Sequence, residues 1–254
     1  MALLKEYHRP QSVQEAVQLL ARQDVRLAPL AGGSQLVGQL ETRAVKDVDG
    51  VVDLGHLGLN FITAEENQLR LGATTPLAHV MDHPVAGQLA DGLLRRTGRY
   101  EGPVNLRNMA TLGGLVATAE PDSELYAALL ALDARVVWSD GTSQEVIPLQ
   151  EWRLAGRGPG LIVELQIPVQ ALNGGHARVA RTPSDRCIVA AVAVVGPELE
   201  RVALCGVASR PILGGEPLDP PDDFKGSAEY RSQMAQVLTE RALQEARKRA
   251  SSGG

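Results

Sequence analysis

Residues 106–134 read LRNMATLGGLVATAEPDSELYAALLALDA, the most specific pattern in the sequence. Its Gly-Gly at 113–114 follows an apolar run, and the residues after it are compatible with a helix. Pro121-Asp122 then precedes a predicted helix over 123–132 that has an apolar face. A second Gly-Gly, at 32–33 in LAPLAGGSQL, stands in the same kind of setting. The recurrence indicates two turns that need an uncovered backbone.

Glycine at both turns has a chemical meaning, because it permits a positive φ and has no Cβ to cover the N–H groups. Successive amides that point at one place form a nest for an anion, and phosphate is the natural ligand. Ser34 and Thr111 each add a hydroxyl group beside their Gly-Gly. The pattern predicts a cradle for a diphosphate. Ordinary tight turns are the alternative, since neither turn matches GxGxxG or GxxxxGK[ST].

Short helices and strands alternate through the first half of the chain. Ser12 and Glu15 form a capping-box pattern ahead of apolar residues at helical spacing, which predicts a helix over 12–22. Strands are expected at 25–30 and 51–54, and a hairpin is expected from 61–63 and 68–71. Further helices are expected at 34–40, 76–81 and 85–97.

The second half of the chain reads mostly as strands. Asp140-Gly141 predicts a type I′ hairpin turn between strands at 134–139 and 142–147. The remaining expected elements are strands at 161–167, 176–181, 188–195 and 201–208 and a helix at about 229–250. Leu172-Asn173-Gly174-Gly175 is the best candidate for a boundary, because such residues mark loops. It divides an α+β body from a smaller C-terminal unit.

Composition limits the possible functions. The net charge of −5 and the aromatic content of 3% argue against nucleic-acid binding, which needs basic surface and stacking platforms. Cys187 and Cys205 stand too far apart in sequence for a CxxC metal site or an iron–sulfur cluster on this chain. No stretch resembles a signal peptide or approaches the ~18 apolar residues of a membrane span. The expected compartment is the cytoplasm, with both thiols reduced.

Single residues offer little catalytic chemistry. His79 and His83 lie four apart on a predicted helix, yet no third ligand stands near them, so a solvated pair is favoured over a metal site. Cys187 opens an apolar strand and is expected in the core. No catalytic acid, base or nucleophile and no metal ligand is nominated.

Five segments together resemble one family. They are LAGGSQL (30–36), the stretch 106–134, LIVELQIP (161–168), HARVARTPSD (176–185) and SAEYRSQMAQVLTERAL (227–243), and they occur in the family's order. They are similar to the FAD-binding medium subunit of the molybdenum hydroxylases, the group that contains carbon monoxide dehydrogenase and xanthine dehydrogenase.

The resemblance implies the PCMH-type FAD-binding fold, of α+β class. Two α+β subdomains, at about 1–55 and 56–170, would form an FAD-binding domain over 1–170. A shortened C-terminal subdomain of a small sheet plus helices would occupy 175–254.

The resemblance also implies the cofactor site, in which both Gly-Gly loops wrap the FAD diphosphate. Glu124 stands at the position of an aspartate that holds the ribose hydroxyls, Ile162 on the adenine side, and Arg178 where a lysine commonly reaches the cofactor. The loops contribute Leu30, Ala31, Gly32, Gly33, Ser34, Gln35 and Leu36, and Thr111, Leu112, Gly113, Gly114 and Leu115.

The implied function is electron transfer without bond-making by this chain. FAD here would pass electrons to an external acceptor, after [2Fe–2S] clusters on a small subunit had received them from a large molybdopterin-binding subunit. A dimer of heterotrimers is the expected assembly. No nucleic acid and no membrane would be involved.

Three departures from the family pattern keep other functions open. Leu115 replaces a usual asparagine, which removes one hydrogen bond of ~1 kcal/mol, residues 210–226 are shorter than usual, and His176 stands where an aromatic residue is common. One alternative is a degenerate, flavin-free subunit with a scaffolding role in the same kind of complex. Another is a self-sufficient flavin oxidase of the broader fold, although the chain has no evident substrate domain.

Overall fold

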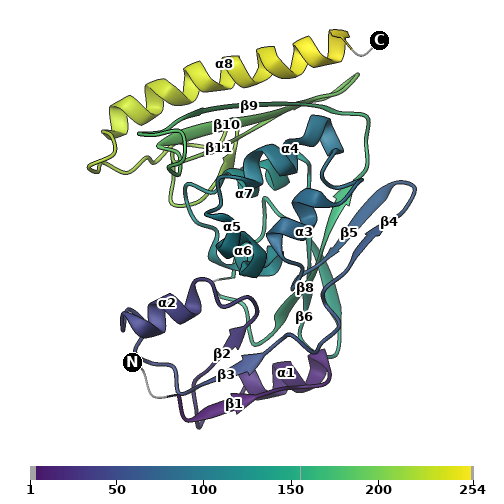
Figure 1. Ribbon diagram of the computed structural model, residues 1–254, viewed down its shortest axis with the longest axis vertical. Helices are drawn as coiled ribbons and strands as arrows, with labels where there is room; N and C mark the ends of the chain where they lie inside the picture. The colour runs from purple at the N-terminus through teal and green to yellow at the C-terminus, as the bar shows by residue number, and fades with distance from the viewer. Residues whose placement is uncertain (1–3, 155, 253–254) are drawn as a thin grey trace.

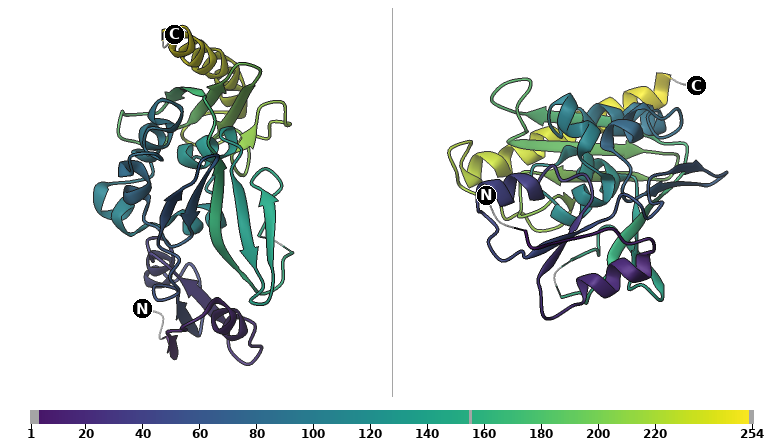
Figure 2. Two further views of the ribbon diagram at one scale, coloured as in Figure 1. Left: turned by 90° about the vertical axis from the view of Figure 1, so that its right-hand side faces the viewer. Right: turned by 60° about the horizontal axis from the view of Figure 1, so that its bottom comes forward.

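The computed structural model describes residues 4–154 and 156–252 and contains three sheets stacked along its long axis (Figure 1). The first sheet has the order β1-β3-β2 and is parallel, with β1 at Glu6–His8, β2 at Leu27–Leu30 and β3 at Gly50–Asp53. Helix α1 (Val13–Leu20) packs against it, and α2 (Leu36–Glu41) follows the first Gly-Gly. This N-terminal unit forms one end of the molecule (Figure 2).

Helix α1 begins where the capping box predicts. The Ser12 hydroxyl accepts a hydrogen bond from the N–H of Glu15, and the Glu15 carboxylate accepts one from the N–H of Gln11. The buried side chains of Ala16 and Val17 pack with Val52 and with side chains of the second sheet. The helix therefore ties the N-terminal unit to the rest of the molecule.

The second sheet is antiparallel, with the order β4-β5-β8-β6-β7. Its strands are β4 (Ile62–Ala64), β5 (Gln68–Gly72), β6 (Arg135–Ser139), β7 (Gln144–Pro148) and β8 (Leu161–Pro168). Five helices lie beside it: α3 (Leu77–Asp82), α4 (Leu89–Gly98), α5 (Val104–Met109), α6 (Leu112–Thr118) and α7 (Glu124–Ala131). Every residue of α7 is buried, which places this helix at the centre of the largest core.

The third sheet is antiparallel with the order β12-β11-β10-β9, and the long helix α8 (Ala228–Ser252) covers it (Figure 1). The strands are β9 (Asn173–Val179), β10 (Val189–Val195), β11 (Glu200–Cys205) and β12 (Ile212–Leu213). Strand β10 alternates: Ala191 and Ala193 pack with side chains of α8, whereas Val192 and Val194 belong to the core around α7. The core thus continues across Leu172–Gly175, the expected domain boundary.

Several local predictions differ from the structure. Asn173, Gly174 and Gly175, expected in a loop, form the start of β9. The helix predicted at 85–97 is interrupted, because Ala90, Asp91 and Gly92 have left-handed backbone and the Asp91 carboxylate accepts the N–H of Gly174. Helix α5 was not predicted, and the helix-compatible residues after the second Gly-Gly belong to α6, which already begins at Leu112 and so has Gly113-Gly114 in its first turn. The hairpin after β6 closes through four residues, 140–143, and not through a type I′ turn, because the Asp140 carboxylate accepts the N–H groups of Thr142 and Ser143.

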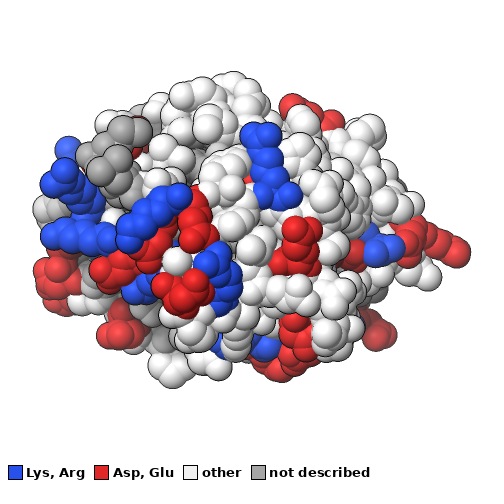
Figure 3. Space-filling view, turned by 90° about the horizontal axis from the view of Figure 1, so that it is seen from below, with Lys and Arg blue, Asp and Glu red and all other residues white. Residues whose placement is uncertain are grey.

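Charged side chains are mixed on the end of the molecule that carries the N-terminal unit, with Lys and Arg beside Asp and Glu (Figure 3). Ion pairs there join Lys5 to Asp49 at 2.7 Å and Arg22 to Glu6 at 2.7 Å. Within the described residues, none of the helices is both long and apolar enough to cross a membrane. The same residues contain no cluster of His, Cys, Asp or Glu that could hold a metal ion.

Candidate functional site: a cavity between the two glycine loops

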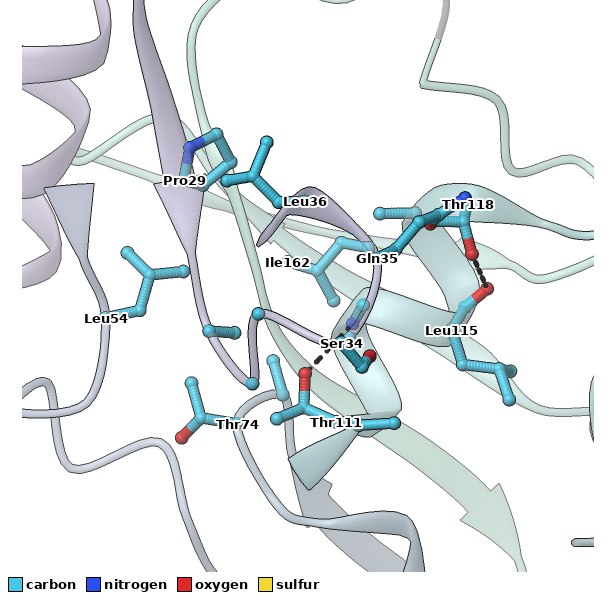
Figure 4. Close-up of a pocket in the computed structure, with 18 of the residues that line it drawn as sticks. Pro29, Ser34, Gln35, Leu36, Leu54, Thr74, Thr111, Leu115, Thr118 and Ile162 are labelled. Carbon is cyan, nitrogen blue, oxygen red and sulfur yellow. Dashed lines mark hydrogen bonds between the residues drawn. The ribbon is translucent and has the colours of Figure 1, made fainter. Parts of the chain in front are cut away.

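A cavity of about 530 Å³ lies where the first Gly-Gly loop meets α6 and β8 (Figure 4). Sites for small molecules and cofactors commonly have volumes of ~300–1,000 Å³. Most of the residues predicted to hold a cofactor line this cavity: Leu30, Ala31, Gly32, Gly33, Ser34, Gln35, Leu36, Thr111, Gly113, Gly114, Leu115 and Ile162. Leu112, Glu124 and Arg178 do not.

The first Gly-Gly loop has the form of an anion nest. Gly33 has a φ of +69°, and a Cβ at Gly32 would lie 1.6 Å from the carbonyl oxygen of Met109. Within the described part of the chain, the N–H groups of residues 32–35 donate no hydrogen bond to the protein. Unpaired consecutive N–H groups at the wall of a cavity call for an anionic acceptor.

The second Gly-Gly has a different role from the predicted one. The N–H of Gly113 donates to the carbonyl oxygen of Ala73 at 2.8 Å, and the N–H of Gly114 donates to the Thr111 hydroxyl at 3.3 Å (Figure 4). A Cβ at Gly113 would lie 2.8 Å from that of Ala73, so this glycine allows close packing of α6. The expectation that both loops present free amides is therefore wrong for the second loop.

Residues of β2, β6 and β8, and the residue that follows β3, give the cavity an apolar wall. Pro29, Leu54 and Ile162 point into it (Figure 4). Trp138 also lines it, at a β-bulge in β6, and its ring packs against that of Trp152 with centroids 5.3 Å apart. Bulges commonly re-aim side chains beside functional sites. An apolar wall of this kind suits a flat ring system.

A hydrogen bond joins the first Gly-Gly loop to the connection between α6 and α7. The Gln35 side-chain amide donates to the Glu120 carboxylate at 2.7 Å, and both residues line the cavity. Sequence reasoning did not identify Glu120. It is a lone acid in a loop, and no motif distinguishes it from a solvated one.

Polar side chains from distant parts of the chain meet at another part of the wall: Glu101, Ser123 and Arg186. The Glu101 carboxylate is 5% exposed and accepts hydrogen bonds from the Ser123 hydroxyl at 2.8 Å and from the N–H of Leu125 at 2.9 Å. Burial raises the pKa of the Glu101 carboxyl above its ordinary value, although the nearby Arg186 guanidinium opposes this. Sequence reasoning missed this group because only the fold brings its members together.

Glu124 and Arg178, predicted to hold the cofactor, instead pair with each other. The Glu124 carboxylate lies 3.0 Å from Nε of Arg178 and 2.6 Å from Nε2 of His176, and its side chain is 1% exposed. The Arg178 guanidinium also stacks on the Tyr100 ring, 3.8 Å from its centroid. Glu124 is the first residue of α7 and faces β9, away from the cavity wall that Ser123 lines. Leu112 is fully buried in the core.

The expected core position of Cys187 is confirmed. Cys187 and Cys205 are both buried, with their sulfur atoms 3.5 Å apart as free thiols. The hydrogen bond between the two thiols and burial together raise the pKa of Cys205 well above its ordinary value. Neither thiol lines the cavity.

Residues 3–170 match the model of one protein family, described as the FAD binding domain in molybdopterin dehydrogenase. The glyceraldehyde dehydrogenase medium chain of Sulfolobus acidocaldarius is 26% identical, over 94% of this chain and 97% of that protein. The carbon monoxide dehydrogenase medium chain of Afipia carboxidovorans is 28% identical, over 96% of this chain and 97% of that protein.

Solved structures give the same result. A chain of the cyanide-inactivated Cu,Mo-CO dehydrogenase superposes with a TM-score of 0.87 at 25% identity, over 98% of this chain and 99% of that one. Quinoline 2-oxidoreductase from Pseudomonas putida 86 has the same fold, with a TM-score of 0.89 at 22% identity, over 98% of this chain and 99% of that one. The resemblance seen in the sequence and the expected fold are confirmed. The chain therefore belongs to the family of FAD binding domains in molybdopterin dehydrogenases, which are oxidoreductases.

Proposed function

We propose that this chain binds FAD in the cavity between its glycine loops and serves as an electron-transfer subunit. The observation that carries the proposal is the set of unpaired N–H groups at residues 32–35, which border the cavity and fit the two phosphates of FAD. Bound FAD would take up electrons from one redox partner and release them to an external acceptor. The protein's own part is to bind, orient and shield the cofactor.

Each part of FAD has a matching part of the wall. The first loop and the Ser34 hydroxyl offer donors to phosphate oxygens. Pro29, Leu54 and Ile162 offer apolar surface to the adenine ring. Gly114 leaves room, because a Cβ there would meet only the Thr111 hydroxyl, at 3.1 Å. Thr111 and Leu115 of the second loop also line the cavity and are proposed contacts of the cofactor.

The proposed partners are a large molybdopterin-binding subunit and a small [2Fe–2S] subunit, arranged as a dimer of heterotrimers in the cytoplasm. Several relatives are named as the medium chain or a lettered subunit of a dehydrogenase, which supports a multi-subunit enzyme. The domain division at about 170–175 belongs to the same proposal, with the glycine loops that would hold the FAD diphosphate inside residues 1–170. The substrate would be set by the large subunit.

A flavin-free scaffolding subunit is the second candidate. Two observations favour it: the amides of Gly113 and Gly114 are already used within the protein, and Glu124 and Arg178 are paired with each other outside the cavity. The position of Leu115, where a polar residue could have bonded the cofactor, points in the same direction. The two candidates differ in whether the cavity takes up FAD.

Titration calorimetry of the full chain with FAD separates the candidates. The variant Gly114→Leu directs a side chain into the cavity, whereas Gly38→Leu places the same side chain on the exposed face of α2, where no atom lies within 4 Å of the added Cβ. We expect Gly114→Leu to weaken FAD binding at least about tenfold, since one lost contact of 1.4 kcal/mol has that effect. Gly38→Leu should bind like the natural chain. Equal affinities for all three proteins would place FAD elsewhere.

A further inference from the structure

Arg186 is a cation in the cavity wall whose donors are incompletely used. It lies in the connection between β9 and β10, and its Nε donates to Oδ1 of Asp122 at 2.8 Å. Its Nη2 is buried and donates no hydrogen bond, although Oε2 of Glu101 lies 3.3 Å away. Nη1 likewise donates to no group in the described residues. A buried donor without an acceptor costs ~1–3 kcal/mol, so an acceptor is missing here.

The surroundings of Arg186 say what kind of acceptor fits. Glu101 lies beside it, Asp122 is bonded to it, and Glu120 lines the same cavity. The Asp122 carboxylate already bonded to Arg186 would oppose a phosphate at this point, because like charges repel at short range. A neutral group that offers carbonyl oxygens to the guanidinium and an N–H to a carboxylate fits both members of the Glu101–Arg186 pair.

FAD contains one group with this chemistry. The pyrimidine edge of its isoalloxazine ring carries two carbonyl oxygens on either side of an N–H, whereas adenine has no carbonyl oxygen. The position agrees, since Arg186 also lines a second, smaller cavity of about 300 Å³ together with Arg181 and Phe224. Phe224 is highly exposed, so this second cavity opens to the outside. The isoalloxazine ring exchanges electrons with an external acceptor, so it has to lie near the surface, between the cofactor cavity and the exterior.

Resting on the proposed FAD site, we propose that Arg186 donates a hydrogen bond to a pyrimidine carbonyl oxygen of the isoalloxazine and sets the reduction potential of the bound cofactor. Reduction adds electrons to the ring and negative charge at this edge. A fixed cation there binds the reduced ring more tightly than the oxidised one and thereby raises the potential. Glu101 holds the guanidinium in place, with Ser123 and the N–H of Leu125 bonded to its carboxylate.

The test compares Arg186→Gln with Arg181→Gln in the full chain loaded with FAD. Arg181 belongs to the same β9–β10 connection and lines only the outer cavity, so it is a matched control. Two readouts are measured: the midpoint potential by titration with reductant against a reference dye, and the affinity for ADP, which contains the diphosphate and adenine but no flavin. We expect Arg186→Gln to lower the preference for reduced over oxidised FAD about tenfold, a fall of about 30 mV for a two-electron couple. Its ADP affinity should stay within about twofold.

The other possible results would overturn either the role of Arg186 or the proposed FAD site. An unchanged potential in FAD-loaded Arg186→Gln overturns the inference and leaves the FAD site intact. A parallel loss of ADP and FAD affinity assigns Arg186 to the diphosphate and also overturns it. Failure of the natural chain to bind FAD removes the proposed function itself. If Arg186→Gln does not fold, the double variant Glu101→Gln with Arg186→Gln removes the unpaired buried acid, and Arg186→Lys, which keeps the charge, should retain most of the potential.

Discussion

At the scale of single residues, four glycines that look alike in the sequence do different things. Gly32 and Gly113 allow backbones to approach, Gly33 supplies a positive φ, and Gly114 keeps space open in the cavity. The residues alone predicted two turns with uncovered backbone amides, because glycine beside a hydroxyl is a local signal, and this holds for the first Gly-Gly but not for the second. The sequence could not assign the separate roles, because each depends on a neighbour distant in the chain.

The backbone at Gly33 gives a direct prediction. The change Gly33→Ala should lower the free energy of unfolding by about 1–2 kcal/mol, because an L side chain is strained at a φ of +69°. The change Gly38→Ala should raise it by up to about 1 kcal/mol, because Gly38 is exposed within a helix and its added Cβ meets nothing within 4 Å. Urea denaturation of both variants measures the difference. A Gly33→Ala protein as stable as Gly38→Ala would contradict the left-handed turn.

Glu101 predicts a dependence of stability on pH. Its pKa is raised above the ordinary 4.5 by burial, so the folded chain binds this proton more tightly than the unfolded chain does. The stability that this group contributes is fully present below pH 4.5 and is lost as the pH rises through the pKa of the folded state. The variant Glu101→Gln stays neutral and keeps that contribution. The free energy of unfolding of Glu101→Gln, relative to that of the natural chain, should therefore increase as the pH rises from 4 toward 7.

Urea denaturation at several pH values checks this prediction, with the exposed Glu66→Gln on the turn between β4 and β5 as the control. The Glu66→Gln curve should run parallel to that of the natural chain. A difference between Glu101→Gln and the natural chain that stays constant or shrinks with rising pH would show that folding does not raise the pKa of Glu101.

Residues paired across the chain were beyond the reach of sequence reasoning. The carboxylate of Glu124 and the guanidinium of Arg178 were both expected at the cofactor, but α7 and β9 bring them together outside the cavity. Arg186 and Glu101 were not identified, although they line it. A motif predicts the loop, helix or strand in which a residue lies. The direction of its charged side chain depends on the charges that the fold places around it.

At the scale of elements, prediction succeeded where the signal was local. The capping box marked α1, and short apolar runs marked β8 and β10. Prediction failed where packing overrode propensity: α6 forms despite two glycines because Gly113 lets it pack against Ala73. The run Ala90 to Gly92 likewise leaves the helical conformation where Asp91 bonds to β9.

Helix α8 should contribute most of the stability of the third sheet through one face. Leu238 is 1% exposed and packs with Ala191 and Ala193, whereas the adjacent Val237 is 38% exposed. The change Leu238→Ala should lower the free energy of unfolding by about 2–5 kcal/mol, because it leaves a cavity in the core. The change Val237→Ala should alter it by less than about 0.5 kcal/mol. Thermal denaturation of the pair tests this, and equal effects would contradict the packing of α8.

At the scale of the whole molecule, the three sheets are joined by two apolar contacts. Ala16, Val17 and Val52 of the N-terminal unit pack with Val137 and Leu161, while α7 connects the second sheet to the third. The cavity lies near the first of these contacts, with the nest, α6 and β8 all contributing residues to its lining. Ligand binding would therefore hold the N-terminal unit and the body together.

Arg186 brings the third sheet to the same site, since it belongs to the β9–β10 connection and lines the cavity. All three parts of the chain thus contribute to one proposed cofactor site. The order of these parts along the sequence was readable in advance, because each sheet is built from a continuous segment. Their convergence on one cavity came from the resemblance to a family and from the structure.

The most direct measurement of the central claim is the amount of FAD that the full chain retains after incubation with the cofactor and desalting. It is read from the visible absorption spectrum, and chromatography identifies the released cofactor. The account predicts close to one FAD per chain. A folded chain that stays colourless, both alone and after co-expression with molybdopterin-binding and [2Fe–2S] subunits, would contradict it and favour the scaffolding role.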